Sequence, residues 1–225
     1  MVDVIALDPV LKLRRCDPEL RNSTRGGPTT RYGRGQRVFS DAGYWHVKIE
    51  MVINSPARSR AYRALAAHLR AGGAVDLPIC AGYRPEGADE SVSWVKIGAN
   101  AALRATELEL DVEGVTVAAG DYYTVNNSLY LVRKVLASPA IDPTLSPWVR
   151  DSPWNDTRLW TDGEDPTASY TVSVLPPIRE AMLNGWTVEA RNPRLRCELA
   201  DISDGDLSLN LLRFGTATLT LRETL

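Results

Sequence analysis

The chain has 225 residues, of which 44% are hydrophobic and 24% are charged, a composition that excludes disordered and fibrous classes. At this length about 70% of the unfolded chain's surface can be buried, so folding requires neither disulfides nor a structural metal. The net charge of −2 conceals an asymmetry: residues 1–70 hold 13 basic and 6 acidic side chains, giving +7, and residues 71–225 hold 13 and 22, giving −9. Such polarity fits a basic surface for nucleic acid, opposite patches that meet in a ring of identical copies, or ordinary solvated faces.

No apolar run approaches the roughly 18 residues of a membrane span, and the first residues lack the pattern of a signal peptide. We therefore expect a chain that neither spans a membrane nor is exported by its own signal.

Cysteine and histidine are scarce. Cys16, Cys80 and Cys197 are odd in number and contain no CxxC pair, so we expect reduced thiols and no metal site. His46 and His68 are the two histidines, which removes most metal-ligand sets and most Ser-His-Asp or Cys-His arrangements. The composition predicts a protein that is not an enzyme and has no catalytic, cofactor-binding or metal-binding residues.

The first distinctive segment is residues 14–37, which are rich in Arg, Gly, Pro and Thr and follow neither a strand nor a helix period. We predict a long loop or extended arm. Its arginines Arg25, Arg31, Arg34 and Arg37 are candidates for contacts between subunits, because a guanidinium engages carboxylates through two parallel hydrogen bonds.

A strand and a helix follow the arm. In residues 45–51 apolar and polar side chains alternate, which predicts a strand with one buried face and His46 on the other. Ser55-Pro56 then predicts the start of a helix over 56–71, with Ser55 as the N-cap and Gly72-Gly73 beyond the end. Ala61, Tyr62, Leu65 and Leu69 form its apolar stripe, and His68 borders it in a structural role.

The remainder is predicted to be almost entirely β. A short strand over 75–79 carries a proline, which favours a sheet edge. Further strands are predicted at 106–112, 122–125, 129–136, 170–175, 186–190, 195–199 and 207–221. Short strands at this spacing are typical of sandwiches and small barrels. Residues 138–168 are predicted to form a long loop whose Trp148, Trp154 and Trp160 cover an edge or a neighbour.

Two groups of acidic residues could be mistaken for sites. Glu107, Glu109 and Asp111 lie on the wet face of an alternating strand, where carboxylates are expected without a catalytic purpose. Asp204 and Asp206 flank Gly205, but the spacing and terminal Glu of a calcium-binding loop are missing, so a polar turn is the better interpretation.

The order of these pieces resembles the distal tail proteins of long-tailed bacteriophages. The resemblance begins with the strand opening on Trp45, the helix of residues 57–69 and Asp76-Leu77-Pro78. Residues 119–125 followed by 129–132 resemble that family's "G-D-hydrophobic … L-Y-R-V" hairpin. Residues 174–179, 185–188 and 192–193 resemble its "PPLR … G-x-x-V … NP" stretch. The resemblance covers about residues 38–225 and does not include the arm.

If the resemblance holds, the chain is a structural virion protein that forms a ring, usually a homohexamer, at the distal end of a phage tail. The resemblance then implies a virion protein assembled in the host cytoplasm, with the tail tube protein and the hub or baseplate proteins as partners. It carries no catalytic residues to transfer and implies no cofactor.

The favoured fold class is mainly β, with a β-sandwich carrying one packed α-helix and an inserted small β-barrel. The sandwich would comprise residues 1–80 and 193–225, and the barrel would comprise 81–192 with the loop 138–168. The runner-up is two consecutive domains divided near residue 90.

Two other functions are considered. Exposed tryptophans on a small β-sandwich also fit a carbohydrate-binding module for host attachment, which oligosaccharide quenching of Trp fluorescence would reveal. The Arg/Gly arm could contact nucleic acid, which would give strongly salt-dependent DNA binding, although no sequence-specific recognition is expected.

Overall fold

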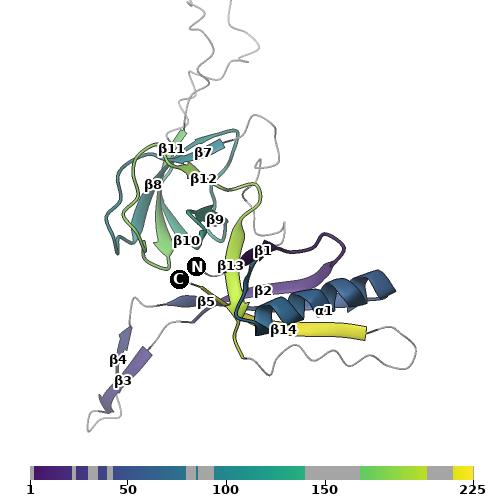
Figure 1. Cartoon of the computed structure of the whole chain (residues 1–225). Helices are drawn as coiled ribbons and strands as arrows, with labels where there is room; N and C mark the ends of the chain where they lie inside the picture. Colours follow the sequence, from purple (N-terminus) through teal and green to yellow (C-terminus); the bar gives the residue numbers. More distant parts are fainter. Residues whose placement is uncertain are drawn as a thin grey trace, which may run out of the picture.

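The protein is mainly β, and its fold is seen in a computed structural model (Figure 1). The structure describes residues 3–21, 24–29, 35–39, 43–79, 85, 94–139, 168–201 and 215–224, with the backbone alone for 24–29 and 35–39. The described strands form two six-stranded sheets and one two-stranded sheet, accompanied by one helix. This confirms the predicted class, a β fold with one packed helix and a second, nearly barrel-shaped sheet.

The first sheet combines strands from both ends of the chain. Its order is β1 (Val4–Ala6), β6 (Ala74–Pro78), β13 (Arg194–Leu199), β14 (Gly215–Glu223), β5 (Tyr44–Ile53) and β2 (Leu13–Arg21). Only the β1–β6 pair among these is parallel. The predicted alternation holds in β5, where Trp45, Val47, Ile49 and Met51 are buried and His46 lies on the other face.

Helix α1 (Pro56–Arg70) covers the buried face of this sheet near β6 and β13. Its start is the predicted cap, because Ser55 Oγ accepts a hydrogen bond of 3.2 Å from Arg58 N. Tyr62, Leu65, Ala66 and Leu69 are its buried residues, so the predicted stripe is confirmed with Ala66 added and Ala61 at its border. His68 Nε2 lies 3.2 Å from both Asp3 O and Ala74 O, which gives it the structural role expected.

The second sheet closes on itself. Its order is β12 (Thr187–Val188), β7 (Trp94–Ile97), β8 (Glu107–Glu113), β11 (Ala168–Leu175), β10 (Ser128–Ala137) and β9 (Tyr122–Val125). Thr124 in β9 and Glu189, just after β12, exchange hydrogen bonds of 3.0 and 2.8 Å between their backbones. These two bonds join the first and last strands of the sheet and make it a barrel.

The sequence positions of the strands divide the molecule into two lobes. The first lobe is the open sheet with α1, built from residues 4–78 and 194–223, and the second lobe is the barrel, built from residues 94–189. Each lobe has its own buried cluster of apolar side chains. Tyr122 and Leu129 are exceptions, because they come from the barrel strands but belong to the cluster of the first lobe.

One prediction in the N-terminal region is wrong. Residues 14–21 are not loop: they lie in β2, an edge strand in which Cys16 pairs with Ile49 and Leu20 with Trp45. The alternation was concealed because the register shifts between Leu13 and Arg15, which puts two arginines side by side. Residues 140–167, which include most of the predicted loop 138–168, lie outside the described residues. So do residues 207–214, and β14 begins at Gly215.

Candidate assembly interface

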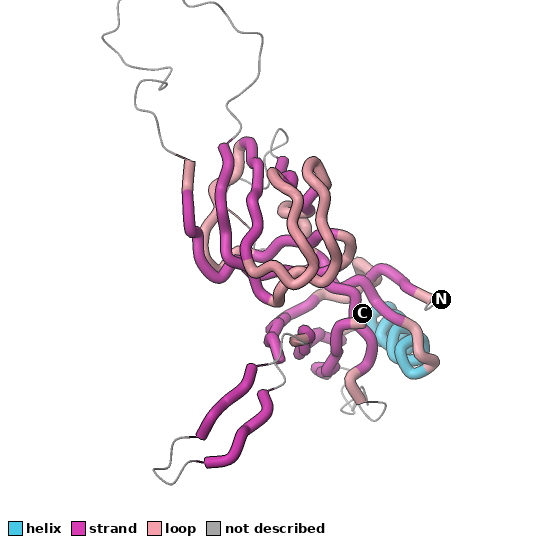
Figure 2. Tube along the Cα trace, turned by 90° about the vertical axis from the view of Figure 1, so that its left-hand side faces the viewer, coloured by secondary structure: helices cyan, strands magenta, loops and turns pink. Residues whose placement is uncertain are grey.

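A two-stranded hairpin leaves the first lobe and contacts neither sheet. It consists of β3 (Thr24–Thr29) and β4 (Gly35–Phe39), which pair with each other and with no other described strand. It continues the β2–β5 pair outward from Arg21 and Tyr44. Figure 2 shows it projecting from the body on the side away from the barrel. We call residues 22–42 the arm.

The structure places only part of the predicted contact residues. Arg25 lies in β3 opposite Val38, and Arg37 lies in β4 opposite Gly26, so both are on the arm. Arg31 and Arg34 lie between these strands, outside the described residues. Trp148, Trp154 and Trp160 also lie outside the described residues, as does Cys80. The aromatic surface expected for carbohydrate binding therefore has no described residue to support it.

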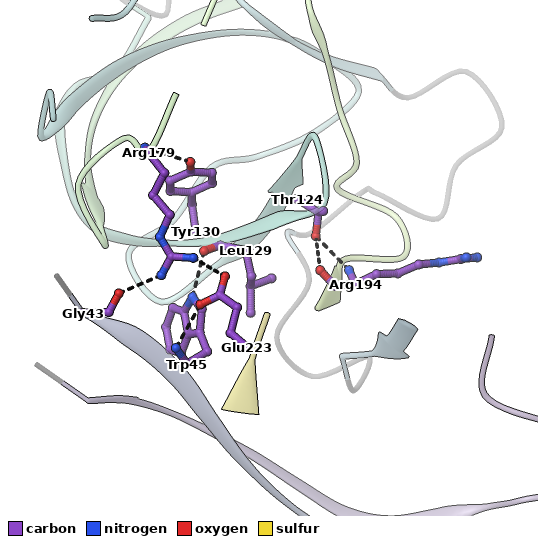
Figure 3. Close-up of polar contacts among 8 residues, drawn as sticks. All are labelled: Gly43, Trp45, Thr124, Leu129, Tyr130, Arg179, Arg194 and Glu223. Carbon is purple, nitrogen blue, oxygen red and sulfur yellow. Dashed lines mark hydrogen bonds and ion pairs between the residues drawn. The ribbon is translucent and has the colours of Figure 1, made fainter. Parts of the chain in front are cut away.

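The base of the arm is clamped to the barrel by a buried ion pair (Figure 3). Arg179, which follows β11, donates from Nη1 to Glu223 Oε1 and from Nη2 to Gly43 O at 2.8 Å. Glu223 Oε2 also accepts from the backbone N of Trp45 at 3.0 Å. The side chain of Glu223 is 2% exposed and that of Arg179 is 17% exposed. A charge pair this buried tolerates little movement, so it fixes where the arm leaves the body.

Trp45 supplies the apolar part of the same contact. Its Nε1 donates to Leu129 O at 2.8 Å, and its ring lies 5.6 Å from that of Tyr122, centroid to centroid. Trp45 is 1% exposed, so the first residues of β5 are packed directly against β9 and β10 of the barrel. We call the contacts of Gly43, Trp45, Leu129, Arg179 and Glu223 the joint.

A second contact ties the barrel to β13. Thr124 Oγ1 donates to Arg194 O and accepts from Arg194 N, both at 2.8 Å (Figure 3). Thr124 also makes the backbone bridge that closes the barrel. One buried threonine therefore connects barrel closure to the first lobe.

The outer edges of the first sheet carry features that discourage pairing with another chain. Strand β2 contains Pro18 and a register shift between Leu13 and Arg15, and it carries charged side chains along its length. Strand β1 has three residues. Both features are protective devices for edge strands, and the second sheet has closed its edges altogether. Of the described sheets, the arm is the one in which both strands keep a free edge.

Sequence reasoning missed Arg179, Glu223 and Thr124 as contact residues. Glu223 gave a usable signal, because it continues the series of buried positions Leu219 and Leu221 at a spacing of two. A carboxylate in phase with a buried face requires a partner. Nothing comparable in the sequence singles out Thr124, whose role depends on a contact 70 residues away.

The titratable groups with clear shifts belong to packed interiors. Burial raises the pKa of Cys197, Tyr123, Tyr130 and Asp121, and in Tyr130 a hydrogen bond from Arg179 N opposes the effect of burial. Tyr123 Oη is buried and has no hydrogen-bond partner in the described chain. Among the described residues no group of three His, Cys, Asp or Glu side chains could hold a metal ion. No described helix is both long and apolar enough to cross a membrane.

No protein-family model matches the chain, and no curated protein matches it either.

Proposed function

We propose that this protein is a structural component of a phage virion. Identical copies form a ring at the distal end of the tail, and the ring joins the tail tube to the tip or baseplate. The proposal makes the protein a non-enzymatic assembly element, with the tail tube protein and the hub or baseplate proteins as its neighbours. Assembly takes place in the host cytoplasm, and a hexamer is the expected ring.

The arm carries this proposal. An isolated two-stranded hairpin is at best marginally stable in water, because it has no hydrophobic face to bury. The arm is such a hairpin, and no described part of its own chain packs against it. A partner surface is therefore needed, and another copy of the chain supplies one at the same concentration as the arm itself.

The joint supports the same conclusion. An arm that closes a ring must leave each copy in the same direction, because a symmetric assembly repeats one contact. The buried Arg179–Glu223 pair and the Nη2 bond to Gly43 O hold the point at which the arm leaves the body. The order of sequence motifs that resembles distal tail proteins places this contact in a tail-tip ring.

Removal of the arm tests the proposal. Deleting residues 23–42 joins Asn22 directly to Gly43, between the paired residues Arg21 and Tyr44. Asn-Gly is the preferred two-residue turn of a β-hairpin, so β2 and β5 remain connected in register. We expect light scattering to give the mass of an oligomer for the full chain and of a monomer for the deletion variant, with the same β-type circular dichroism. A full chain that is monomeric at every concentration and salt would refute the proposal.

A further inference from the structure

The outer face of β8 in the barrel carries a row of carboxylates. Glu107, Glu109, Asp111 and Glu113 alternate with the buried Leu108, Leu110 and Val112. Side chains two residues apart on a strand lie about 7 Å from each other on the same face, so the row is a continuous stripe of one charge. We call these four residues with their β11 neighbours Ser169, Thr171 and Ser173 the β8 face.

The two halves of the β8 face differ in their contacts. Asp111 accepts a hydrogen bond of 2.6 Å from Ser169 Oγ, and Glu113 accepts one from Trp94 Nε1. Lys96 lies opposite Asp111 in the strand register and provides a positive charge at this end. Glu107 and Glu109 are exposed at the other end, and neither has a hydrogen bond or ion pair within the described chain. They pair in register with Ser173 and Thr171.

This end of the face lacks a positive partner. Neighbouring like charges on one strand face repel each other, and a cation laid over them removes the repulsion. The surface around them is flat, since β8 and β11 are adjacent antiparallel strands whose outward side chains are carboxylates and hydroxyls. Carboxylates and hydroxyls accept hydrogen bonds from guanidinium groups.

The arm has the opposite character. Residues 22–42 contain four arginines, no lysine and one acidic residue, which gives +3, whereas residues 81–192 contain 9 basic and 16 acidic residues, which gives −7. Arg25 and Arg37 lie on neighbouring register rows of the arm, one on each strand. A two-stranded ribbon with an arginine on each strand can place two guanidinium groups over two adjacent carboxylates.

The arm cannot meet the β8 face of its own chain in this structure. Figures 1 and 2 show the arm leaving the first lobe in the direction away from the barrel, with β8 on the far side of the molecule. We propose that the β8 face, at Glu107 and Glu109, is the docking surface for the arm of a neighbouring copy. This inference rests on the proposed function, because it names the surface that receives the arm in the ring.

A pair of variants with matched charge tests the docking surface. Glu107→Gln with Glu109→Gln raises the net charge by two on the β8 face, and Thr216→Lys with Thr218→Lys raises it by two on the exposed face of β14. We expect the first pair to weaken self-association at least tenfold in sedimentation at low salt, and the second pair to change it less than twofold. Equal effects of the two pairs would reduce the result to net charge and overturn the proposal.

A charge exchange tests the contact itself. Arg25→Glu with Arg37→Glu reverses the arm, and Glu107→Arg with Glu109→Arg reverses the β8 face. Each reversal alone should dissociate the oligomer, and the chain that carries both should recover it, because the attraction is restored with its sign exchanged. Failure of the combined variant to recover, while each single reversal remains folded by circular dichroism, would overturn the proposal.

These outcomes separate the inference from the function on which it rests. If deletion of the arm gives monomers while both β8 variants remain fully oligomeric, the ring stands and its docking surface lies elsewhere. If the unaltered chain never associates, the ring itself fails.

Discussion

The arm and the joint are neighbours in sequence, yet their support within the chain is opposite. Gly43 and Trp45 at the joint are buried and are held by hydrogen bonds from Arg179 and to Leu129 and Glu223. A few residues earlier, β4 pairs with β3 and with no other described strand. The chain therefore invests its buried polar contacts in fixing the base of a hairpin that it does not itself cover. The difference indicates that the joint serves folding and orientation, whereas the arm serves assembly.

The largest expected effect on stability comes from breaking the joint. Arg179→Ala leaves the Glu223 carboxylate buried with the Trp45 N–H as its remaining printed partner, and removing one member of a buried ion pair costs about 3 kcal/mol. Urea unfolding followed by circular dichroism measures this loss.

The exposed pair between Arg222 and Glu198 provides the control for that measurement, because it joins neighbouring strands of the same sheet at the surface. Arg222→Ala should cost about 1 kcal/mol or less. If the two arginine variants were equally stable, the joint would not be the buried clamp described here.

The second contact between the lobes should contribute less. Thr124→Val keeps the side-chain volume but removes the hydroxyl that bonds Arg194 N and O, which should lower the free energy of unfolding by about 2 kcal/mol. Thr124→Ser retains the hydroxyl and should recover most of that loss. Equal losses in the valine and serine variants would assign the effect to packing instead of hydrogen bonding.

Alkaline pH tests whether the sheet beside the joint is dry. Burial, followed by the nearby Glu223, raises the pKa of the Cys197 thiol well above its usual value of 9.0. Its contribution is fully present below pH 9 and decreases above it, because the unfolded thiol ionises first. Between pH 9 and 10 the stability difference between the full chain and Cys197→Ala should narrow by about 1 kcal/mol. A difference that stays constant in urea unfolding over this range would mean that Cys197 is hydrated.

The smallest expected effect on stability comes from removing the arm. Since β3 and β4 pair with no other described strand, deletion of residues 23–42 should change the free energy of unfolding of the monomer by about 1 kcal/mol or less. Urea unfolding at a concentration too low for association makes the comparison with Arg179→Ala direct. A loss as large as that of the joint variant would show that the arm belongs to the fold.

Much of the fold was predictable from local patterns. The alternation in β5 and the cap of α1 involve residues close together in sequence, and both predictions are confirmed. Strand β2 was missed because a register shift and Pro18 obscure its period, although pairing with β5 makes it a strand.

The candidate interface was less predictable. The arginines of the arm were visible in the sequence, but the joint unites Gly43, Arg179 and Glu223, which lie up to 180 residues apart. No local signal brings such residues together, since their proximity depends on β14 lying beside β5 and on the barrel returning to the first lobe. The unpaired carboxylates of β8 were seen as a wet strand face, and their isolation from positive charge required the register of β7 and β11.

Electron microscopy of the purified protein tests the central claim most directly, since that claim is that arms join identical copies into a ring. The full chain should appear as closed rings of one size, and the variant lacking residues 23–42, examined at the same concentration, should appear as single particles. Single particles for the full chain at every concentration and salt, or unchanged rings without the arm, would contradict the account.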